Sequence, residues 1–183
     1  DAQPHLVIFC KNREIEIEFR DKKLEKVKES TQNSLNISIY VQQRYSSHST
    51  NDLRRESLQK FIEEAVASTK YLSQDPFRSL PDPKYYPQNL DLDLIICDKN
   101  YENIDSSNRV KMAAEIEAAA MAQSDQIIST TAGYSDGYSE SLRIHSNGFI
   151  GENESTSFWA GAEVTVKDKE GNRFLIIILN KTI

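Results

Sequence analysis

Hydrophobic and polar residues alternate along the first fifty residues of the chain. The alternation is clearest over residues 14–19 and 35–41, where every second side chain is apolar. A period of two residues places the apolar side chains on one face of a β-strand. Shorter strands are predicted at residues 6–10, 24–31 and 44–50. Together these segments are typical of a β-meander.

Two helices are predicted where the apolar period changes from two residues to about 3.6. The first follows Asn51 or Asp52, either of which could cap it, and its apolar stripe ends at Thr69. The second begins near Asp105 and ends near Gln123. Small residues along one side of the second helix would let it pack closely on a sheet.

A proline-rich loop separates the two predicted helices. Residues 75–87 hold four of the five prolines, and proline donates no main-chain hydrogen bond. Phe77, Tyr85 and Tyr86 are expected to pin this loop to the body of the protein. A short extended segment is predicted at residues 90–97.

The last third of the chain returns to a β pattern. A strand opens at Ile127, and Asn147-Gly148 within residues 146–149 indicates a hairpin, because this pair tolerates positive φ angles. Residues 163–167 alternate, a second turn is predicted at 168–172, and residues 174–179 form an apolar strand. We therefore predict an α+β fold, a two-layer sandwich of a mostly antiparallel sheet with two main helices on one face.

Composition and charge exclude several functions. The formal net charge of -6 disfavours nucleic acid as a partner, because phosphate contacts need a basic surface. No apolar run approaches the roughly 20 residues of a membrane-spanning helix. Cys10 and Cys97 both follow apolar residues, which favours buried, reduced thiols and a cytoplasmic location. A chain of 183 residues fits one domain, or at most one and a half.

The sequence contains no recognisable catalytic motif. His5, His48 and His145 are not spaced to place two imidazoles on one helix face, as a zinc-binding helix requires. Neither cysteine belongs to a CxxC pair. A nucleophilic site assembled in space from Cys and His, or from Ser, His and Asp, stays open. Residues 132–138 are interpreted as an exposed strand end or turn, with a tyrosine- and serine-rich binding surface as the alternative.

Several short segments are informative as a set because of the order in which they follow one another along the chain. They are residues 44–53, 64–67, 75–77 with 80–83, 117–120, and 133–137 with 146–149. In this order and spacing, over about residues 13–168, the chain resembles the N-terminal domain of the TldD/PmbA family of zinc metallopeptidases. Two features differ from the family: strand-like sequence begins at Leu6 without a long preceding helix, and residues 174–179 are unusually apolar.

The resemblance implies a role in handling peptides or unfolded chains, assembly as a homo- or heterodimer with a family member, and a cytoplasmic location. Some relatives carry the label modulator of DNA gyrase. The family's zinc motif, HExxxH, lies in a separate C-terminal domain, and no position here matches it. Residues 1–183 are therefore interpreted as a single N-terminal-like domain without its catalytic domain, inactive alone. No cofactor is expected in this chain, and zinc is expected in the C-terminal domain.

The predicted function is peptide binding by β-augmentation, in which an extended peptide adds to a sheet edge through main-chain hydrogen bonds. No catalytic and no metal-binding residue is predicted. The alternative is a stand-alone interaction module without protease activity. The candidate peptide-binding residues come from two segments, and they are Arg44, Ser46, His48, Tyr134, Ser135 and Tyr138.

Overall fold

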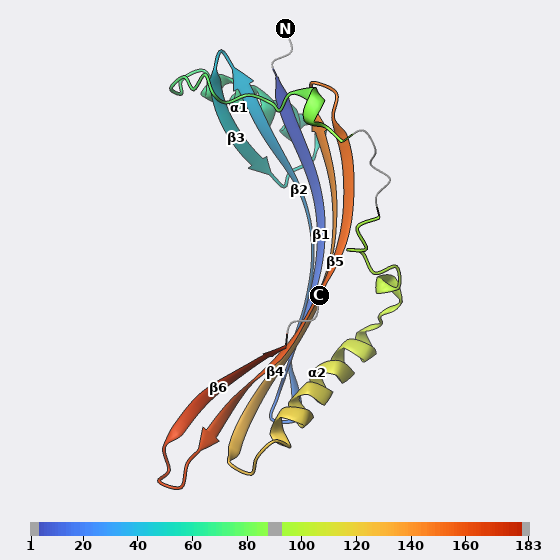
Figure 1. Ribbon diagram of the computed structural model, residues 1–183, viewed down its shortest axis with the longest axis vertical. Helices are drawn as coiled ribbons and strands as arrows, with labels where there is room; N and C mark the ends of the chain where they lie inside the picture. Colours follow the sequence, from blue (N-terminus) through green and yellow to red (C-terminus); the bar gives the residue numbers. More distant parts are fainter. Residues whose placement is uncertain (1–3, 88–92, 181–183) are drawn as a thin grey trace. The chain divides into compact units, whose positions relative to one another are not determined.

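The computed structural model describes residues 4–87 and 93–180, and side chains in these ranges as far as Ile176. Within these ranges, six strands and two α-helices form the fold, with two short 3₁₀ helices between α1 and α2 (Figure 1). In chain order the elements are β1 (His5–Arg20), β2 (Lys23–Val41), β3 (Arg44–Thr50), α1 (Arg55–Thr69), η1 (Pro83–Tyr85), η2 (Tyr101–Asn103), α2 (Ser106–Met121), β4 (Ile127–His145), β5 (Ile150–Lys167) and β6 (Arg173–Asn180).

The strands form one sheet in the order β3-β2-β1-β4-β5-β6. β3 runs antiparallel to β2, and β6 runs antiparallel to β5. β1 and β4 are also antiparallel: Ser146 donates to the carbonyl of His5 at one end, and Asp21 donates to that of Thr130 at the other. The predicted α+β class, with a mostly antiparallel sheet, is confirmed. No helix among the described residues has the length and apolar character to cross a membrane.

The chain divides into two compact units, each built from three separate segments. Unit 1 consists of Asp1–Asn12, Gln32–Ile95 and Ser139–Glu154, and unit 2 of Arg13–Thr31, Ile96–Tyr138 and Ser155–Ile183. β1, β2, β4 and β5 each contribute to both units. The prediction of one domain over residues 1–183 stays a prediction.

In unit 1, α1 covers the sheet face that carries the odd-numbered residues of β2. Ile37, Ile39 and Val41 form a buried cluster with Ala65 of α1, and Val7 of β1 packs against this cluster. Burial of each such aliphatic side chain contributes about 1.5–3 kcal/mol. The predicted cap at Asn51 or Asp52 is wrong: α1 begins at Arg55, and the Asp52 carboxylate binds the main chain and guanidinium of Arg54 instead.

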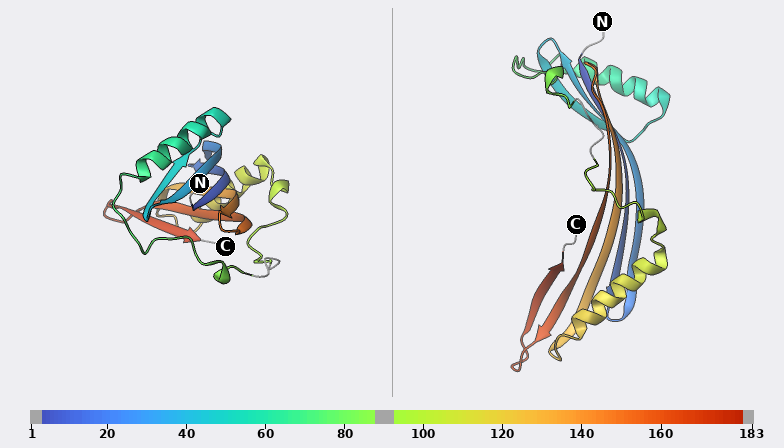
Figure 2. Two further views of the ribbon diagram at one scale, coloured as in Figure 1. Left: turned by 90° about the horizontal axis from the view of Figure 1, so that it is seen from above. Right: turned by 45° about the vertical axis from the view of Figure 1, so that its right-hand side comes forward.

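In unit 2, α2 lies along the sheet as a second layer (Figure 2). Ala113 packs on Ile15, Ile17 and Tyr134, and Ala120 packs on Ala132, Ala162 and Val164. Alanine brings the helix backbone close to the strands, as predicted. The predicted start is also confirmed, because the Asp105 side chain accepts a hydrogen bond from the Asn108 main chain at 2.7 Å. As in unit 1, the helix packs against odd-numbered residues of β1.

The two turns predicted near the C-terminal end are present. Gly148 has a φ of 106° between β4 and β5, and Gly171 has a φ of 91° between β5 and β6. Both values lie in the region that glycine adopts without steric cost. Part of the segment predicted at residues 90–97 lies outside the described residues.

The proline-rich loop is held by one aromatic side chain instead of three. The Tyr86 hydroxyl lies 2.7 Å from Asn147 Oδ1 and 2.9 Å from His145 Nδ1. Phe77 and Tyr85, which were expected to pin the loop, are 94% and 74% exposed. Burial, and secondarily the charge of Arg143, lower the pKa of His145. A neutral imidazole is therefore favoured at this anchor.

Candidate functional site

The predicted residues of β3 serve mainly to hold unit 1 together. The Arg44 guanidinium donates to the carbonyl of Leu72 at 2.8 Å and to that of Gln42 at 3.1 Å. It therefore ties the chain that leaves α1 to the β2–β3 turn. Its hydrogen-bonding capacity is partly used before any ligand binds.

Ser46 and His48 lie on the face of β3 that α1 covers. Ser46 is 9% exposed, and its Oγ lies 2.5 Å from Thr69 Oγ1 and 2.8 Å from His48 Nε2. The His48 ring also meets Phe61 edge-on. This Ser–His contact does not form a hydrolase site, because the serine lies beneath the helix and no described carboxylate bonds to His48. What β3 offers to a ligand is its main chain.

The main chain of β3 is available because β3 is an end strand of the sheet. Its seven residues, Arg44–Thr50, pair with β2 on one side only among the described residues. An unpaired strand edge presents alternate N–H and C=O groups to any extended chain beside it. β3 is therefore a geometrically suitable site for strand addition.

The other predicted segment, residues 133–138, lies in the middle of β4. Since β4 is flanked by β1 and β5, this segment has no free edge, and strand addition there is excluded. The interpretation of residues 132–138 as an exposed strand end or turn is wrong. Tyr134 is buried and donates to Asp136, and Tyr138 stacks against Tyr101 with ring centroids 5.9 Å apart. Peptide binding by these side chains stays a prediction.

Asp136 is the centre of a buried hydrogen-bond network in unit 2. Arg109 donates to its two carboxylate oxygens at 2.6 and 3.2 Å, and the hydroxyls of Tyr101 and Tyr134 donate at 2.8 and 2.9 Å. Burial and the hydrogen bond to Asp136 raise the pKa of Tyr101 to about 12. The same causes raise that of Tyr134. Every oxygen of Asp136 has a donor, so the network is structural and holds no free group for chemistry.

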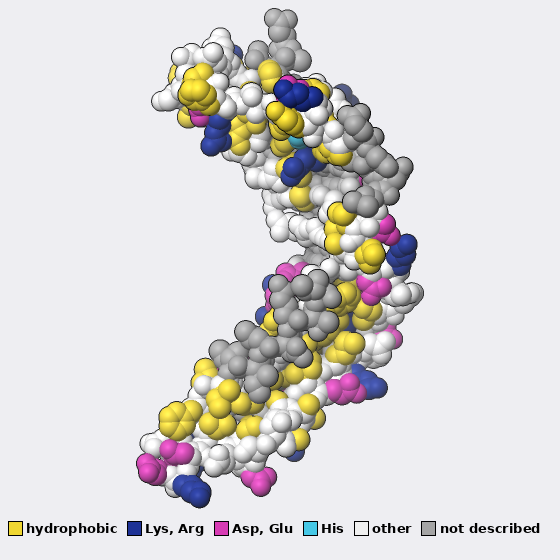
Figure 3. All heavy atoms as spheres, viewed as in Figure 1, with side chains coloured by type: hydrophobic (Ala, Val, Ile, Leu, Met, Phe, Trp, Pro, Cys, Tyr) yellow, Lys and Arg dark blue, Asp and Glu magenta, His cyan; other side chains and the backbone are white. Residues whose placement is uncertain are grey.

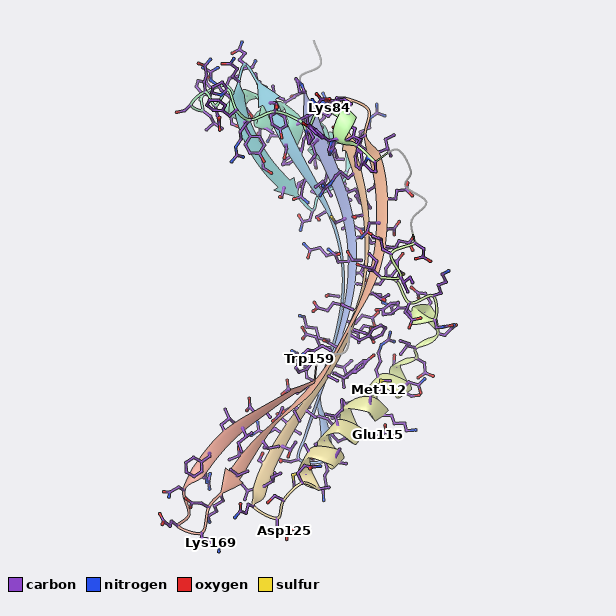
Figure 4. All side chains as sticks on the ribbon, in the orientation of Figure 1. Lys84, Met112, Glu115, Asp125, Trp159 and Lys169 are labelled. Atoms are coloured by element: carbon purple, nitrogen blue, oxygen red, sulfur yellow. The ribbon has the colours of Figure 1, made fainter. Side chains whose placement is uncertain are left out.

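Ser135 faces the opposite side of the sheet and lines a hollow of about 430 Å³ in unit 2. Trp159, labelled in Figure 4, also lines this hollow, and its ring edge lies against Gly133. Glu16, Glu18, Lys26 and Glu163 stand among the other lining residues. Of the six predicted residues, Tyr134 and Ser135 line this hollow. Trp159 is not among the residues predicted from the sequence.

β6 is the other end strand, and its sequence is apolar from Phe174 to Leu179. Phe174, Leu175 and Ile176 are 52%, 60% and 46% exposed, and hydrophobic side chains gather around this part of unit 2 in Figure 3. Exposed end strands normally carry charges or proline that block pairing with another chain. β6 lacks both between Phe174 and its end at Asn180.

The described residues do not fit a zinc ion. Within residues 4–87 and 93–180, no group of three or more His, Cys, Asp or Glu side chains is placed to hold a metal. His48 and His145 each bond to a hydroxyl group instead. Cys10 and Cys97 are free and half-buried, so the expectation of fully buried thiols is wrong.

Two family models match the chain. The first, described as PmbA/TldA metallopeptidase domain 1, matches residues 7–69, and the second, described as PmbA/TldA metallopeptidase central domain, matches residues 99–175. No curated protein sequence matches the chain.

Three solved structures resemble the chain over nearly its whole length. A protein of Bacteroides thetaiotaomicron, named a candidate modulator of DNA gyrase, is 31% identical with a TM-score of 0.89, and 96% of the chain aligns to 40% of it. A candidate gyrase modulator of Thermotoga maritima is 15% identical with a TM-score of 0.73, and TldE of Thermococcus kodakarensis is 16% identical with a TM-score of 0.71. In both, 98% of the chain aligns to 40% of the relative. The chain thus spans about 40% of the length of these relatives.

Proposed function

Because the chain belongs to the PmbA/TldD metallopeptidase family, we propose that it forms a non-catalytic part of such an enzyme, binding extended peptide and assembling with a second family member. The cleavage chemistry and its zinc ion belong, in this proposal, to the part of the relatives that the chain does not span. A cytoplasmic location is part of the same proposal and is compatible with two free cysteines.

The observation that carries the proposal is the pair of unpaired sheet edges. β3 presents seven residues of free main chain, and β6 presents an apolar end strand. Main-chain hydrogen bonds recognise an extended peptide with little dependence on its sequence. Such recognition suits a protein that handles unfolded chains. We assign peptide addition to β3 and chain assembly to β6.

Amide hydrogen exchange of the chain, measured with and without an unstructured peptide that lacks lysine and arginine, tests the assignment to β3. Strand addition is expected to slow exchange at alternate amides of Arg44–Thr50, because alternate N–H groups of an end strand point outward. Amides in the middle of β4 serve as an internal control, since both of its neighbours are already in place.

The same peptide, N-methylated at every second residue, provides the matched control ligand. N-methylation removes the main-chain donors and keeps the side chains, so binding is expected to be lost. Equal binding of the two peptides, or unchanged exchange along β3, would contradict the proposed mode.

Sedimentation of the chain tests assembly through β6. The substitution Leu175→Lys places a charge on this edge strand and is expected to shift the chain from dimer to monomer. Val27→Lys is the matched control, because Val27 is also an exposed apolar residue of a strand, at 58%. A monomeric wild type, or a Leu175→Lys variant that still dimerises, would overturn this assignment.

A peptidase assay with added zinc tests whether the chain is catalytic by itself. No turnover of an unfolded peptide is expected, because the described side chains form no metal site. Zinc-dependent cleavage by the 183-residue chain would refute the non-catalytic role.

A further inference from the structure

Trp159 is the single tryptophan of the chain, and the Cζ3–Cη2 edge of its ring lies against Gly133 of β4 in unit 2. A Cβ atom at Gly133 would lie 2.6 Å from Trp159 Cζ3 and 3.1 Å from Cη2. Real side chains do not approach so closely, so glycine is what permits the ring to rest on β4. The ring therefore contacts β4 through this edge, and Trp159 remains 39% exposed. Aromatic surface is therefore available to a ligand.

The hollow beside this ring is lined by three carboxylates. Glu16 is neutralised by Lys26 at 2.8 Å and Lys28 at 3.3 Å, and the hydrogen bonds from these two lysines lower its pKa. Glu18 and Glu163 form no hydrogen bond or ion pair within the described residues. Even with both lysines counted, the carboxylates are in excess by one.

An aromatic face beside unpaired carboxylates is the arrangement that binds an organic cation. Tryptophan is the aromatic side chain that attracts a cation most strongly, and arginine both stacks on rings and donates to carboxylates through its planar guanidinium. The volume of about 430 Å³ lies within the roughly 300–1,000 Å³ typical of ligand sites. A purely structural role, with Trp159 covering a glycine, would not require Glu18 and Glu163 to be left unpaired beside it.

We propose that this hollow binds the arginine side chain of a peptide, with the guanidinium stacked on Trp159 and hydrogen-bonded to Glu18 and Glu163. The proposal rests on the proposed peptide-binding function and adds a side-chain preference to it. It concerns the face of the sheet in unit 2, and its contacts are independent of the main-chain edge of β3.

Fluorescence of Trp159 reports binding directly, because no other tryptophan contributes. The probes are two blocked tripeptides, one with a central arginine and one with a central citrulline, which has nearly the same shape without the charge. The arginine peptide is expected to change the emission in a saturable way and to bind roughly tenfold more tightly than the citrulline peptide. Added salt is expected to weaken binding of the arginine peptide.

Variants that remove the charge of Glu18 or Glu163 test whether these carboxylates bind the arginine side chain. Glu18→Gln and Glu163→Gln are each expected to weaken binding of the arginine peptide roughly threefold to tenfold, and not that of the citrulline peptide. Asp125→Asn is the matched control, because Asp125 is an exposed carboxylate in the turn after α2 and is not among the lining residues (Figure 4). The comparison of the two peptides on the wild type does not depend on the folding of any variant.

Equal affinity for the two peptides, or no fluorescence change with arginine, would overturn the arginine site. Affinities unaffected by Glu18→Gln and Glu163→Gln would do the same. If the peptide without basic residues still slows exchange along β3, only the arginine site has failed. If neither peptide type binds, the proposed function itself has failed.

Discussion

The Asp136 carboxylate of β4 accepts two hydrogen bonds from the Arg109 guanidinium of α2, and both side chains are almost fully buried. Removing one member of such a pair leaves an uncompensated charge in the interior. Asp136→Ala is therefore expected to lower the free energy of unfolding by about 3–5 kcal/mol, measured by urea denaturation.

The surface pair Lys111–Glu115 provides the control for this prediction. Both side chains are largely exposed, and Glu115→Gln is expected to change stability by less than about 0.5 kcal/mol. If Asp136→Ala proved as mild as Glu115→Gln, the network would not stabilise unit 2 in the way described.

Tyr101 makes stability depend on alkaline pH. Its pKa is about 12 in the folded chain against an ordinary value of 10.0, because burial and Asp136 both disfavour the phenolate. The protonated Tyr101 stabilises the fold fully below pH 10. As the pH rises towards 12, the free energy of unfolding falls by roughly 2–3 kcal/mol. Urea denaturation across this range is expected to show a smaller decline for Tyr101→Phe. Tyr85→Phe, at an exposed position, is expected to follow the wild type.

Glu117 holds the β1–β2 turn from the helix side. Its Oε1 accepts a hydrogen bond from the Lys22 main chain at 3.0 Å, and the side chain is 2% exposed. Glu117→Ala is expected to cost about 1–3 kcal/mol and to speed hydrogen exchange at the Lys22 amide. An unchanged exchange rate at Lys22 would show that the turn does not depend on the helix.

Gly133 sets the position of Trp159. The Cβ added by Gly133→Ala would displace the indole from the strand, because the ring atom Cζ3 lies only 2.6 Å away. Emission from Trp159 is expected to shift to longer wavelength as the ring enters water. Gly148→Ala serves as the control, because no atom lies within 4 Å of its added Cβ. That variant should leave the emission unchanged, although its φ of 106° makes it less stable.

The sequence predicted the elements of the fold better than their lengths. Strands expected at residues 6–10 and 14–19 are one strand, β1, which continues through the exposed residues Lys11 and Asn12. Because Lys11 and Asn12 are polar and exposed, they interrupt the apolar pattern, and the sequence predicts two strands in place of one. The family resemblance is confirmed, because order and spacing of short segments do not depend on strand length.

The candidate site was harder to predict because it depends on partners distant in sequence. Arg109 lies on the sheet-facing side of α2, and Asp136 lies on the helix-facing side of β4. Opposite charges at these two buried positions are the signal that the sequence offers for the pair. Trp159 and Gly133 carry no such signal, since their contact requires knowledge of how β4 and β5 are aligned. Ser46 and His48 are candidates because they lie in a segment predicted to bind peptide by strand addition, and the sequence does not reveal that α1 covers them.

The interleaving of the two units has a consequence for modularity. Consider a cut of the chain near residue 94. The N-terminal fragment would lack the Ser139–Glu154 segment of unit 1, and it would still carry the Arg13–Thr31 segment of unit 2. Neither unit can be moved to another protein as one contiguous cassette, by recombination or by cloning. The two matched family segments, residues 7–69 and 99–175, each contribute residues to both compact units, so neither unit corresponds to one matched segment.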